Sequence, residues 1–178
     1  MERTHRLFFA LWPTEALRDE LVKTVEPLFE RKRGRRIRAD NFHITLAFLG
    51  AVQARKLPSI MEAASGIEGE PLELELEKIE VWPGSRVLCL TPGRCASLNE
   101  LVDGLRRNLA AHQVELDQKD FRPHVTVARE WRDRSVEGAI QPIKWSADEF
   151  VLVESESTRE GSRYRIIGRW PLATRSQD

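Results

Sequence analysis

The chain has 178 residues, and its 28 basic and 28 acidic residues give a formal net charge of zero. A hydrophobic fraction of 41% beside 31% charged residues excludes a largely disordered chain, and the length suits one compact domain. The apolar run 7–12 is too short for a signal peptide or a membrane span, so we expect a soluble, cytoplasmic protein without a membrane partner.

Predicted strands and helices alternate in the first third of the chain. Residues 7–11 form an apolar run typical of a buried strand, and apolar residues at helical spacing over 14–28 predict a helix that ends by Gly34. Over 42–47 apolar residues alternate with other types, which indicates a strand with one buried face. A second helix is predicted over 54–64.

Alternation resumes over 72–81, where leucines face one side of a predicted strand and glutamates the other. The parity of the apolar residues shifts near Glu77 and Lys78, which predicts a β-bulge. A Pro-Gly-Ser turn at 83–85 leads into another apolar run, 87–90, so the two strands are predicted to form a hairpin.

A third helix is predicted over 97–111, where an apolar stripe recurs and Ser97 and Glu100 have the spacing of a capping box. Three further strands are predicted over 124–128, 150–154 and 164–172. No linker divides the chain, so residues 1–178 are expected to form a single domain. The element order predicts an α+β fold in which helices cover one face of mostly antiparallel sheets.

A four-residue word occurs twice, as His-Ile-Thr-Leu at 43–46 and as His-Val-Thr-Val at 124–127. In each predicted strand the period of two places the histidine and the threonine on one face, opposite the residues that pack into the core. The chain therefore presents an imidazole beside a hydroxyl on two different strands.

Two such imidazoles suit in-line displacement at phosphorus, because imidazole has an ordinary pKa of about 6.5 and exchanges protons near neutrality. One histidine can remove a proton from the attacking group while the other supplies a proton to the leaving oxygen. Threonine hydroxyls can donate hydrogen bonds to the non-bridging oxygens. We therefore predict acid-base chemistry on a phosphodiester by His43 and His124, assisted by Thr45 and Thr126, without a metal or another cofactor.

A single strand histidine is more often structural than catalytic, and the repetition of the word is what favours catalysis. His5 and His112 have no such context and are expected to be structural. A metal site is disfavoured because neither word has a second ligand at the usual spacing, and Cys89 and Cys95 lack zinc-binding spacing. The sequence also contains no P-loop and no K-x-D-G motif for a lysyl-nucleotide intermediate.

With both words in view, the sequence resembles the 2H phosphoesterase superfamily, and within it the RNA 2′,3′-cyclic phosphodiesterases, also called 2′-5′ RNA ligases. The resemblance covers nearly the whole chain, although residues 38–40 lack a tryptophan expected in many relatives. It rests on Arg6-Leu-Phe-Phe-Ala-Leu11, Asn41-Phe-His-Ile-Thr-Leu-Ala-Phe-Leu-Gly50, Phe121-Arg-Pro-His-Val-Thr-Val-Ala-Arg129, Phe150-Val-Leu-Val-Glu-Ser155, Tyr164 and Arg169-Trp-Pro-Leu172.

The resemblance implies a bilobal fold with pseudo-twofold symmetry, in which two antiparallel sheets line a central cleft and helices cover the outer faces. It implies hydrolysis of an RNA-terminal 2′,3′-cyclic phosphate to a 2′-phosphomonoester, with ATP-independent 2′-5′ RNA ligation as the reverse reaction. His43 would be the proton donor to the departing 3′ oxygen and His124 the proton acceptor, while Thr45 and Thr126 would hold the phosphate. The partner would be such an RNA or a related nucleotide, and no obligate protein partner is evident.

Phe48 and Arg129 each follow their histidine by five residues and would form a substrate-binding pair that could stack on a base. Strand parity instead places Phe48 on the core face, and packing is the favoured expectation for it. Arg129 would continue an apolar face, so we expect the strand to end or bend there, and contact with phosphate or base stays open. The basic run 31–38 either steers an RNA tail or is a solvated helix end.

Two other functions stay open. The same fold could act as an RNA-binding or nucleotide-binding module, although the presence of both histidines and both threonines favours catalysis. A phosphodiesterase for a small cyclic nucleotide, such as ADP-ribose 1″,2″-cyclic phosphate, is the second alternative. The width of the cleft and the reach of the basic run would distinguish it from an RNA enzyme.

Overall fold

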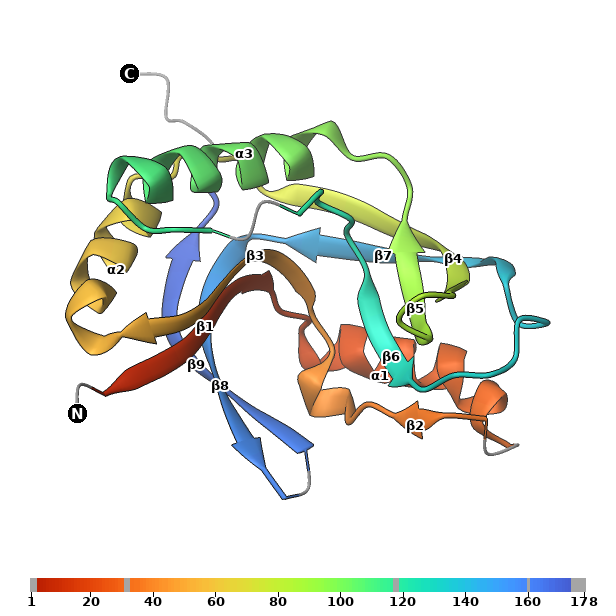
Figure 1. Cartoon of the computed structure of the whole chain (residues 1–178). Coiled ribbons are helices and arrows are strands. Elements are labelled where there is room, and N and C mark those ends of the chain that lie inside the picture. The colour runs from red at the N-terminus through yellow and green to blue at the C-terminus, as the bar shows by residue number, and fades with distance from the viewer. Residues whose placement is uncertain (1–2, 31–32, 117–118, 160, 174–178) are drawn as a thin grey trace.

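The computed structural model of the chain describes residues 3–30, 33–116, 119–159 and 161–173. Figure 1 shows curved strands with α1 on one side and α2 and α3 on the other. In chain order the elements are β1 (Thr4–Leu11), α1 (Glu15–Val25), the 3₁₀ helix η1 (Glu26–Phe29), β2 (Arg35–Arg36), the 3₁₀ helix η2 (Ala39–Asn41), β3 (Ile44–Gln53), the 3₁₀ helix η3 (Ala54–Lys56), α2 (Leu57–Ser65), β4 (Leu72–Trp82), β5 (Val87–Pro92), α3 (Ala96–Ala111), β6 (Val125–Arg129), β7 (Gly138–Ala147), β8 (Glu149–Thr158) and β9 (Gly161–Pro171).

In the described part of the chain nine strands join into one antiparallel sheet. Their order is β7-β4-β5-β6-β3-β1-β8-β9, and β2 pairs with β6 beside this path. The two halves of the path meet at one residue pair, Ile44 of β3 opposite Val125 of β6. The expected α+β class with antiparallel strands is confirmed, and the two expected sheets are joined into one at this pair.

The two halves repeat one arrangement. β1, α1 and β3 form a strand-helix-strand unit whose last strand begins directly after His43, and β5, α3 and β6 form another whose last strand begins directly after His124. Ile44 and Val125, the next residues, face each other across the junction. The pseudo-twofold axis that the resemblance implies therefore passes close to this pair.

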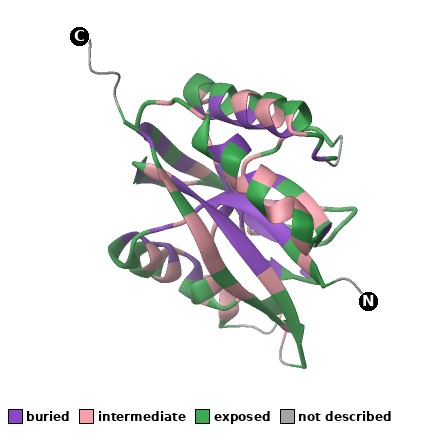
Figure 2. Cartoon of the chain, turned by 90° about the vertical axis from the view of Figure 1, so that its left-hand side faces the viewer, coloured by how far each residue is buried: buried purple, intermediate pink, exposed green. Residues whose placement is uncertain are grey.

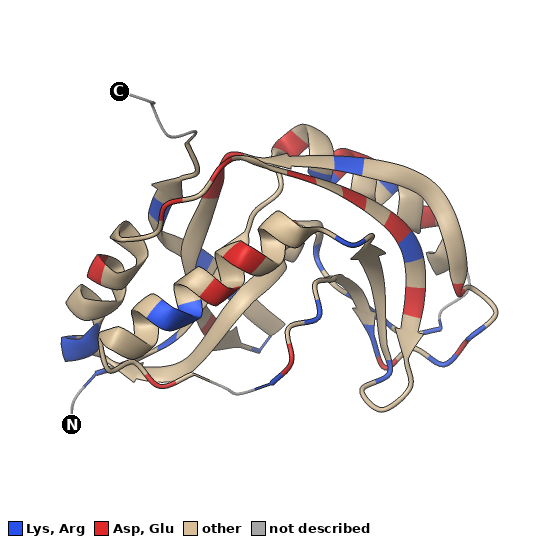
Figure 3. Cartoon of the chain, turned by 90° about the horizontal axis from the view of Figure 1, so that it is seen from above, with Lys and Arg blue, Asp and Glu red and all other residues tan. Residues whose placement is uncertain are grey.

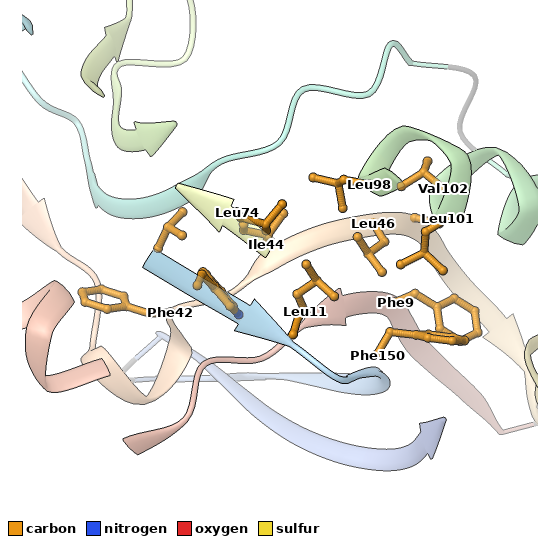
Figure 4. Close-up of a cluster of buried hydrophobic side chains, with 14 of the residues drawn as sticks. Phe9, Leu11, Phe42, Ile44, Leu46, Leu74, Leu98, Leu101, Val102 and Phe150 are labelled. Carbon is orange, nitrogen blue, oxygen red and sulfur yellow. The ribbon is translucent and has the colours of Figure 1, made fainter. Parts of the chain in front are cut away.

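Each long helix packs on the half of the sheet to which it does not belong. α1 contacts β7, and α3 contacts β3. Figure 4 shows Leu98, Leu101 and Val102 of α3 beside Phe9 and Leu46 of the other half, and all five belong to one cluster of buried residues. Each helix thus joins its own half of the sheet to the other half.

The predicted apolar stripe of the third helix is confirmed. Leu98, Leu101, Val102, Leu105 and Leu109 are the buried residues of α3. Figure 2 shows burial concentrated in the central strands and on the inner sides of the helices. The outer side of α3, nearest the viewer in Figure 3, carries both acidic and basic residues. Nowhere in the described ranges is a helix both long and apolar enough to cross a membrane.

Three helix boundaries differ from the prediction. Residues 54–56, predicted as the start of the second helix, form the 3₁₀ helix η3, and α2 begins at Leu57. α1 ends at Val25 and continues as a 3₁₀ turn, because Pro27 has no N–H with which to extend the α-helical ladder. α3 begins at Ala96, after the extended residue Cys95, and no side chain caps it. Ser97 therefore lies inside the first turn, and the predicted capping box is wrong.

Gly34 does not end the first helix. A Cβ atom at this position would lie 2.8 Å from the indole of Trp131 and 2.9 Å from the carbonyl oxygen of Arg129. Such distances are too short for two non-bonded carbon or oxygen atoms. Glycine is therefore required here because the chain entering β2 passes directly against the end of β6.

The strand predictions hold with two omissions, the two-residue strand β2 and the edge strand β7. The bulge expected near Glu77 and Lys78 is present, because the register of β4 shifts between Leu76 and Lys78 against both neighbours. β7 lies in a segment that was expected to be a loop. Its Pro142 cannot donate to a ladder, but β7 is an edge strand, where proline is tolerated.

A buried carboxylate links three strands of the first half. Glu154 of β8 is 6% exposed, and its carboxylate accepts hydrogen bonds from Nδ1 of His5 on β1 and, at 2.5 Å, from the Arg165 guanidinium on β9. The hydrogen bond from His5, and to a smaller extent the one from Arg165, holds the pKa of the Glu154 carboxyl below its usual range. His5 thus has a structural contact, as expected for it.

We expect this carboxylate to make stability depend on acid pH. A carboxyl whose pKa is lowered on folding stabilises the folded state fully above its ordinary pKa, here 4.5, and the contribution disappears as the pH falls through the lowered value. Glu154→Gln should lower the free energy of unfolding at pH 7 by about 1–3 kcal/mol and weaken its dependence on pH below about 5. Urea denaturation at a series of pH values measures both effects. The exposed Glu156→Gln on the same strand is the control, and equal behaviour of the two variants would contradict the prediction.

Candidate active site

The single residue pair between the two halves positions both words. Ile44 and Val125 are fully buried, and they lie opposite each other in an antiparallel register. Since side chains alternate along a strand, the histidine and threonine of each word project from the opposite face. The antiparallel direction sets the histidine of each word across from the threonine of the other, so the four side chains face one space.

Both strands carry a β-bulge at the same place in the word. The pairing of β3 with β1 skips Leu46, and the pairing of β6 with β5 skips Val127, the fourth residue of each word. A bulge reverses the parity of the residues after it. Phe48 and Arg129 therefore turn toward the side of their histidines. Phe48 is 37% exposed, so the expectation that it packs into the core is wrong, while the bend expected before Arg129 is present.

The words open on a cleft of about 490 Å³. All six predicted site residues line this cleft: His43, Thr45, Phe48, His124, Thr126 and Arg129. Its basic lining residues are Arg6, Arg35, Arg36, Arg38 and Arg129, besides the two histidines. Within the described part of the chain no Asp or Glu lines it. The cleft is therefore suited to an anion.

One wall of the cleft was not predicted from the sequence. The hairpin of β8 and β9 contributes several hydroxyl side chains and Tyr164 to the lining. Asn41 donates a hydrogen bond from Nδ2 to the carbonyl oxygen of Ser162 at 2.9 Å and so ties the hairpin to the segment before His43. Arg6 was missed as a site residue although it begins one of the segments that carry the resemblance. Its guanidinium carbon lies 5.0 Å from the centroid of the Phe48 ring.

The basic run reaches the cleft. Arg35, Arg36 and Arg38 all line it where β2 pairs with β6. Each of the three forms a hydrogen bond with a neighbouring carboxylate, which offsets part of the positive charge. Arg31 and Lys32 lie outside the described residues. This location suits the RNA-steering interpretation better than a helix end remote from the site, and contact with RNA stays a prediction.

Backbone carbonyls orient the two histidine rings in the same way. Nδ1 of His43 donates to the carbonyl oxygen of Asn41 at 2.7 Å, and Nδ1 of His124 donates to that of Arg122 at 2.7 Å. Because a carbonyl oxygen only accepts, each Nδ1 carries a hydrogen and each Nε2 is the atom free for proton exchange. Nε2 of His43 also lies 3.0 Å from Oγ1 of Thr45, whose hydroxyl can donate to it.

Burial lowers the pKa of both histidines. For His43 the pKa falls to about 4, since the charges of His124 and Arg129 act with burial and the carbonyl of Asn41 opposes it only in part. The pKa of His124 is lowered by burial and by the charges of Arg122 and Arg129, against its own backbone hydrogen bond. An anion bound between the rings would raise both pKa values, because a negative charge favours the imidazolium. Binding of a phosphodiester would thus help to protonate the pair.

The two rings have different neighbours. Three aromatic rings surround His43, with centroids at 4.9 Å for Phe8, 5.4 Å for Trp12 and 5.4 Å for Tyr164. The indole of Trp82 lies beside His124, with the two ring centroids 4.3 Å apart. The guanidinium carbon of Arg122 lies 4.2 Å from the centroid of the same Trp82 ring. The environments of the two histidines are therefore not symmetric.

Other residues with reactive side chains lie apart from the cleft. His112 donates from Nδ1 to the carbonyl oxygen of Asn108 at 2.9 Å and ends α3. Cys89 and Cys95 are free thiols, and burial raises the pKa of Cys89 to about 12, which keeps it protonated at neutral pH. Over the ranges that the structure describes, no three His, Cys, Asp or Glu side chains form a group that could hold a metal ion.

Comparison with known proteins adds four findings. The sequence model of the LigT-like phosphoesterase family matches residues 11–89 and 91–164. The chain is 34% identical over 179 aligned residues to an Escherichia coli K12 protein named RNA 2′,3′-cyclic phosphodiesterase, and the alignment covers 97% of this chain and 99% of that protein. The crystal structure of E. coli LigT in apo form matches with a TM-score of 0.86 and 30% identity, and the match covers 98% of this chain and 100% of that one. The E. coli LigT complex with 3′-AMP matches with a TM-score of 0.85 and 30% identity over 97% and 100% of the two chains.

Proposed function

The chain belongs to the LigT-like phosphoesterase family of the 2H superfamily, and we propose that it hydrolyses RNA-terminal 2′,3′-cyclic phosphate to a 2′-phosphomonoester with His43 and His124 as acid and base. The observation that carries this proposal is the paired orientation of the two rings. In each ring Nδ1 is held by a backbone carbonyl, and Nε2 points away from that carbonyl. Both rings line the same cleft, and the other charged side chains that line it, among the described residues, are arginines. Such an arrangement supplies two proton-exchanging atoms beside a site for an anion.

The reaction uses one proton transfer at each histidine. Nε2 of His124 removes a proton from water, whose oxygen attacks phosphorus and forms the new P–O bond. The bond between phosphorus and the 3′ oxygen breaks, and Nε2 of His43 gives its proton to that oxygen. The phosphate stays on the 2′ oxygen, so the product is a 2′-phosphomonoester. If the 5′-hydroxyl of a second RNA takes the place of water as the nucleophile, the same two proton transfers would form a 2′-5′ phosphodiester and release the 3′ oxygen, which would account for 2′-5′ ligation.

Hydroxyls and one guanidinium hold the phosphate in this scheme. Thr45 and Thr126 share the face of the histidines, and their hydroxyls would donate to the non-bridging oxygens, where charge accumulates. Arg129 follows β6 on the same side after the bulge and would contact the phosphate with a charge-assisted hydrogen bond. Phe48, at the matching place in the other half, offers a face on which the terminal base could stack. No step requires a metal, and the free thiols suit a reducing cytoplasm.

The test is an incubation of the purified protein, in EDTA, with a short RNA that ends in a 2′,3′-cyclic phosphate. ADP-ribose 1″,2″-cyclic phosphate is assayed in parallel, and the RNA products are resolved as 2′-phosphate or 3′-phosphate. We expect complete conversion to the 2′-phosphate in the presence of the chelator. Turnover of the ADP-ribose compound alone would favour the small-nucleotide alternative, and binding without turnover of either would favour a binding module.

A further inference from the structure

The three rings around His43 form an aromatic cage, defined as Phe8, Trp12 and Tyr164. The plane of the Trp12 indole is only 7° from that of the imidazole, which is a stacked arrangement, whereas Phe8 is tilted by 33° and Tyr164 stands edge-on at 88°. Tyr164 also meets Trp12 and Phe8 in edge contacts, with centroids 6.3 Å and 5.1 Å away. The rings thus support one another as well as the imidazole.

The cage belongs to a separate hydrophobic cluster on the cleft side of the first half. Phe8 is buried there with three residues of β1 and β8, and Trp12 and Tyr164 pack against the cluster. Phe8 and Tyr164 also line the cleft, but Trp12 does not. Trp12 therefore affects the reaction through its neighbours, and its stacked neighbour is His43.

We propose that this cage, and Trp12 above all, holds the His43 imidazolium in place as the proton donor. The inference rests on the two-histidine function proposed above. The face of an aromatic ring carries negative charge density and attracts a cation within about 6 Å, most strongly for tryptophan and where water is excluded. The centroid of the stacked Trp12 indole lies 5.4 Å from that of the His43 ring, which is within this distance. Trp12 is thus a positioning residue that acts through His43.

The surroundings of His124 explain why an aromatic face does not stabilise its imidazolium in the same way. Its recorded ring neighbour, Trp82, has the guanidinium of Arg122 at 4.2 Å from its centroid. The Arg122 guanidinium is a permanent cation that already interacts with the face of the Trp82 indole. Its positive charge also lowers the pKa of His124 and so disfavours the His124 imidazolium. When a bound phosphodiester raises the pKa values of the pair and one histidine takes up a proton from solvent, the cage therefore favours that proton on His43 and leaves His124 as the base.

Among the residues that the structure describes, no carboxylate lies in the cleft to stabilise the His43 imidazolium. The charged or titratable groups that face His43 are His124, Arg129, the phenol of Tyr164 and the four other arginines that line the cleft. Within the described residues the lining holds neither Asp nor Glu. Besides the cage, the neutral group that favours the imidazolium is the carbonyl of Asn41.

The experiment compares Trp12→Leu with Trp12→Phe. Leucine keeps apolar bulk without a π face, whereas phenylalanine keeps a face, so the difference between them separates the cation-π effect from packing. NMR titration of the histidine rings in saturating inorganic phosphate should show the pKa of His43 about one unit lower in Trp12→Leu than in the unchanged protein, with a smaller shift in Trp12→Phe. The pKa of His124 should not fall in either variant.

Kinetics on the cyclic-phosphate RNA give the second measurement. The alkaline limb of the kcat profile, which reports the acid, should move to lower pH by about one unit in Trp12→Leu, while the acidic limb stays in place. Trp82→Leu is the matched control and should not move the alkaline limb. If Trp12→Leu fails to fold, Tyr164→Leu takes its place in the titration, because Tyr164 is only partly buried.

Equal shifts in the leucine and phenylalanine variants, or equal shifts at both histidines, would overturn the cage proposal. The titration in phosphate does not require turnover, so it decides this proposal even if the unchanged protein proves inactive. Inactivity of the unchanged protein on the RNA would instead count against the proposed function.

Discussion

His43→Ala and His124→Ala should each lower kcat on RNA ending in a 2′,3′-cyclic phosphate by about 10²- to 10⁴-fold, because each removes one proton transfer from the transition state. Alanine leaves the strand pairing at Ile44 and Val125 intact, so both variants should fold normally. Rapid-quench or steady-state kinetics measure kcat, and thermal unfolding checks the fold.

The double variant and a third histidine sharpen this result. If the two histidines act as a unit, the double variant should be little slower than the slower single variant, because one missing proton transfer already blocks the shared pathway. His112→Ala is the matched control, since that ring hydrogen-bonds to the carbonyl oxygen of Asn108 and does not line the cleft. Retention of full activity in either single variant would exclude the two-histidine mechanism.

Arg129→Ala should lower kcat/KM on the same RNA by about 10- to 100-fold. A hydrogen bond from a guanidinium to an anion contributes about 1.5–3 kcal/mol, and each factor of ten corresponds to about 1.36 kcal/mol. Arg129 lines the cleft, and its charge also lowers the pKa of both His43 and His124. In the protein without ligand, the variant should therefore show both histidine pKa values raised by NMR titration.

A conservative variant separates the two effects of this arginine. Arg129→Lys keeps a positive charge but loses the planar fork, so it should leave the histidine pKa values low while restoring only part of kcat/KM. Arg169→Ala is the control, because Arg169 is exposed, pairs with Glu149 and does not line the cleft. An unchanged kcat/KM in Arg129→Ala would remove this residue from the phosphate site.

Pairs of residues whose relation is local were predictable from the sequence. The alternation of side chains within a strand places His43 beside Thr45 and His124 beside Thr126, and no tertiary information is needed for that. The bulge at Glu77 was predictable for the same reason, since a shift of apolar parity is visible within one strand. The repetition of the word then indicated which histidines share a task.

Relations between distant segments needed the tertiary structure. Parity along β3 placed Phe48 in the core, but the bulge at Leu46 depends on how β3 pairs with β1, and that bulge turns Phe48 to the cleft. The edge strand β7 was missed because its tolerance of Pro142 follows from having one neighbour only.

The sequence by itself thus determined the α+β class, the two words and the chemistry that paired imidazoles can perform. Only the tertiary structure decided that these words face one cleft with no carboxylate among its described lining residues, that the β8–β9 hairpin forms one wall of it, and that His43 stands in an aromatic cage. The physical reason is that side-chain alternation is a property of the local backbone. Burial, charge and ring contacts at a site depend instead on segments such as β1 and β9, which the fold brings together from opposite ends of the chain.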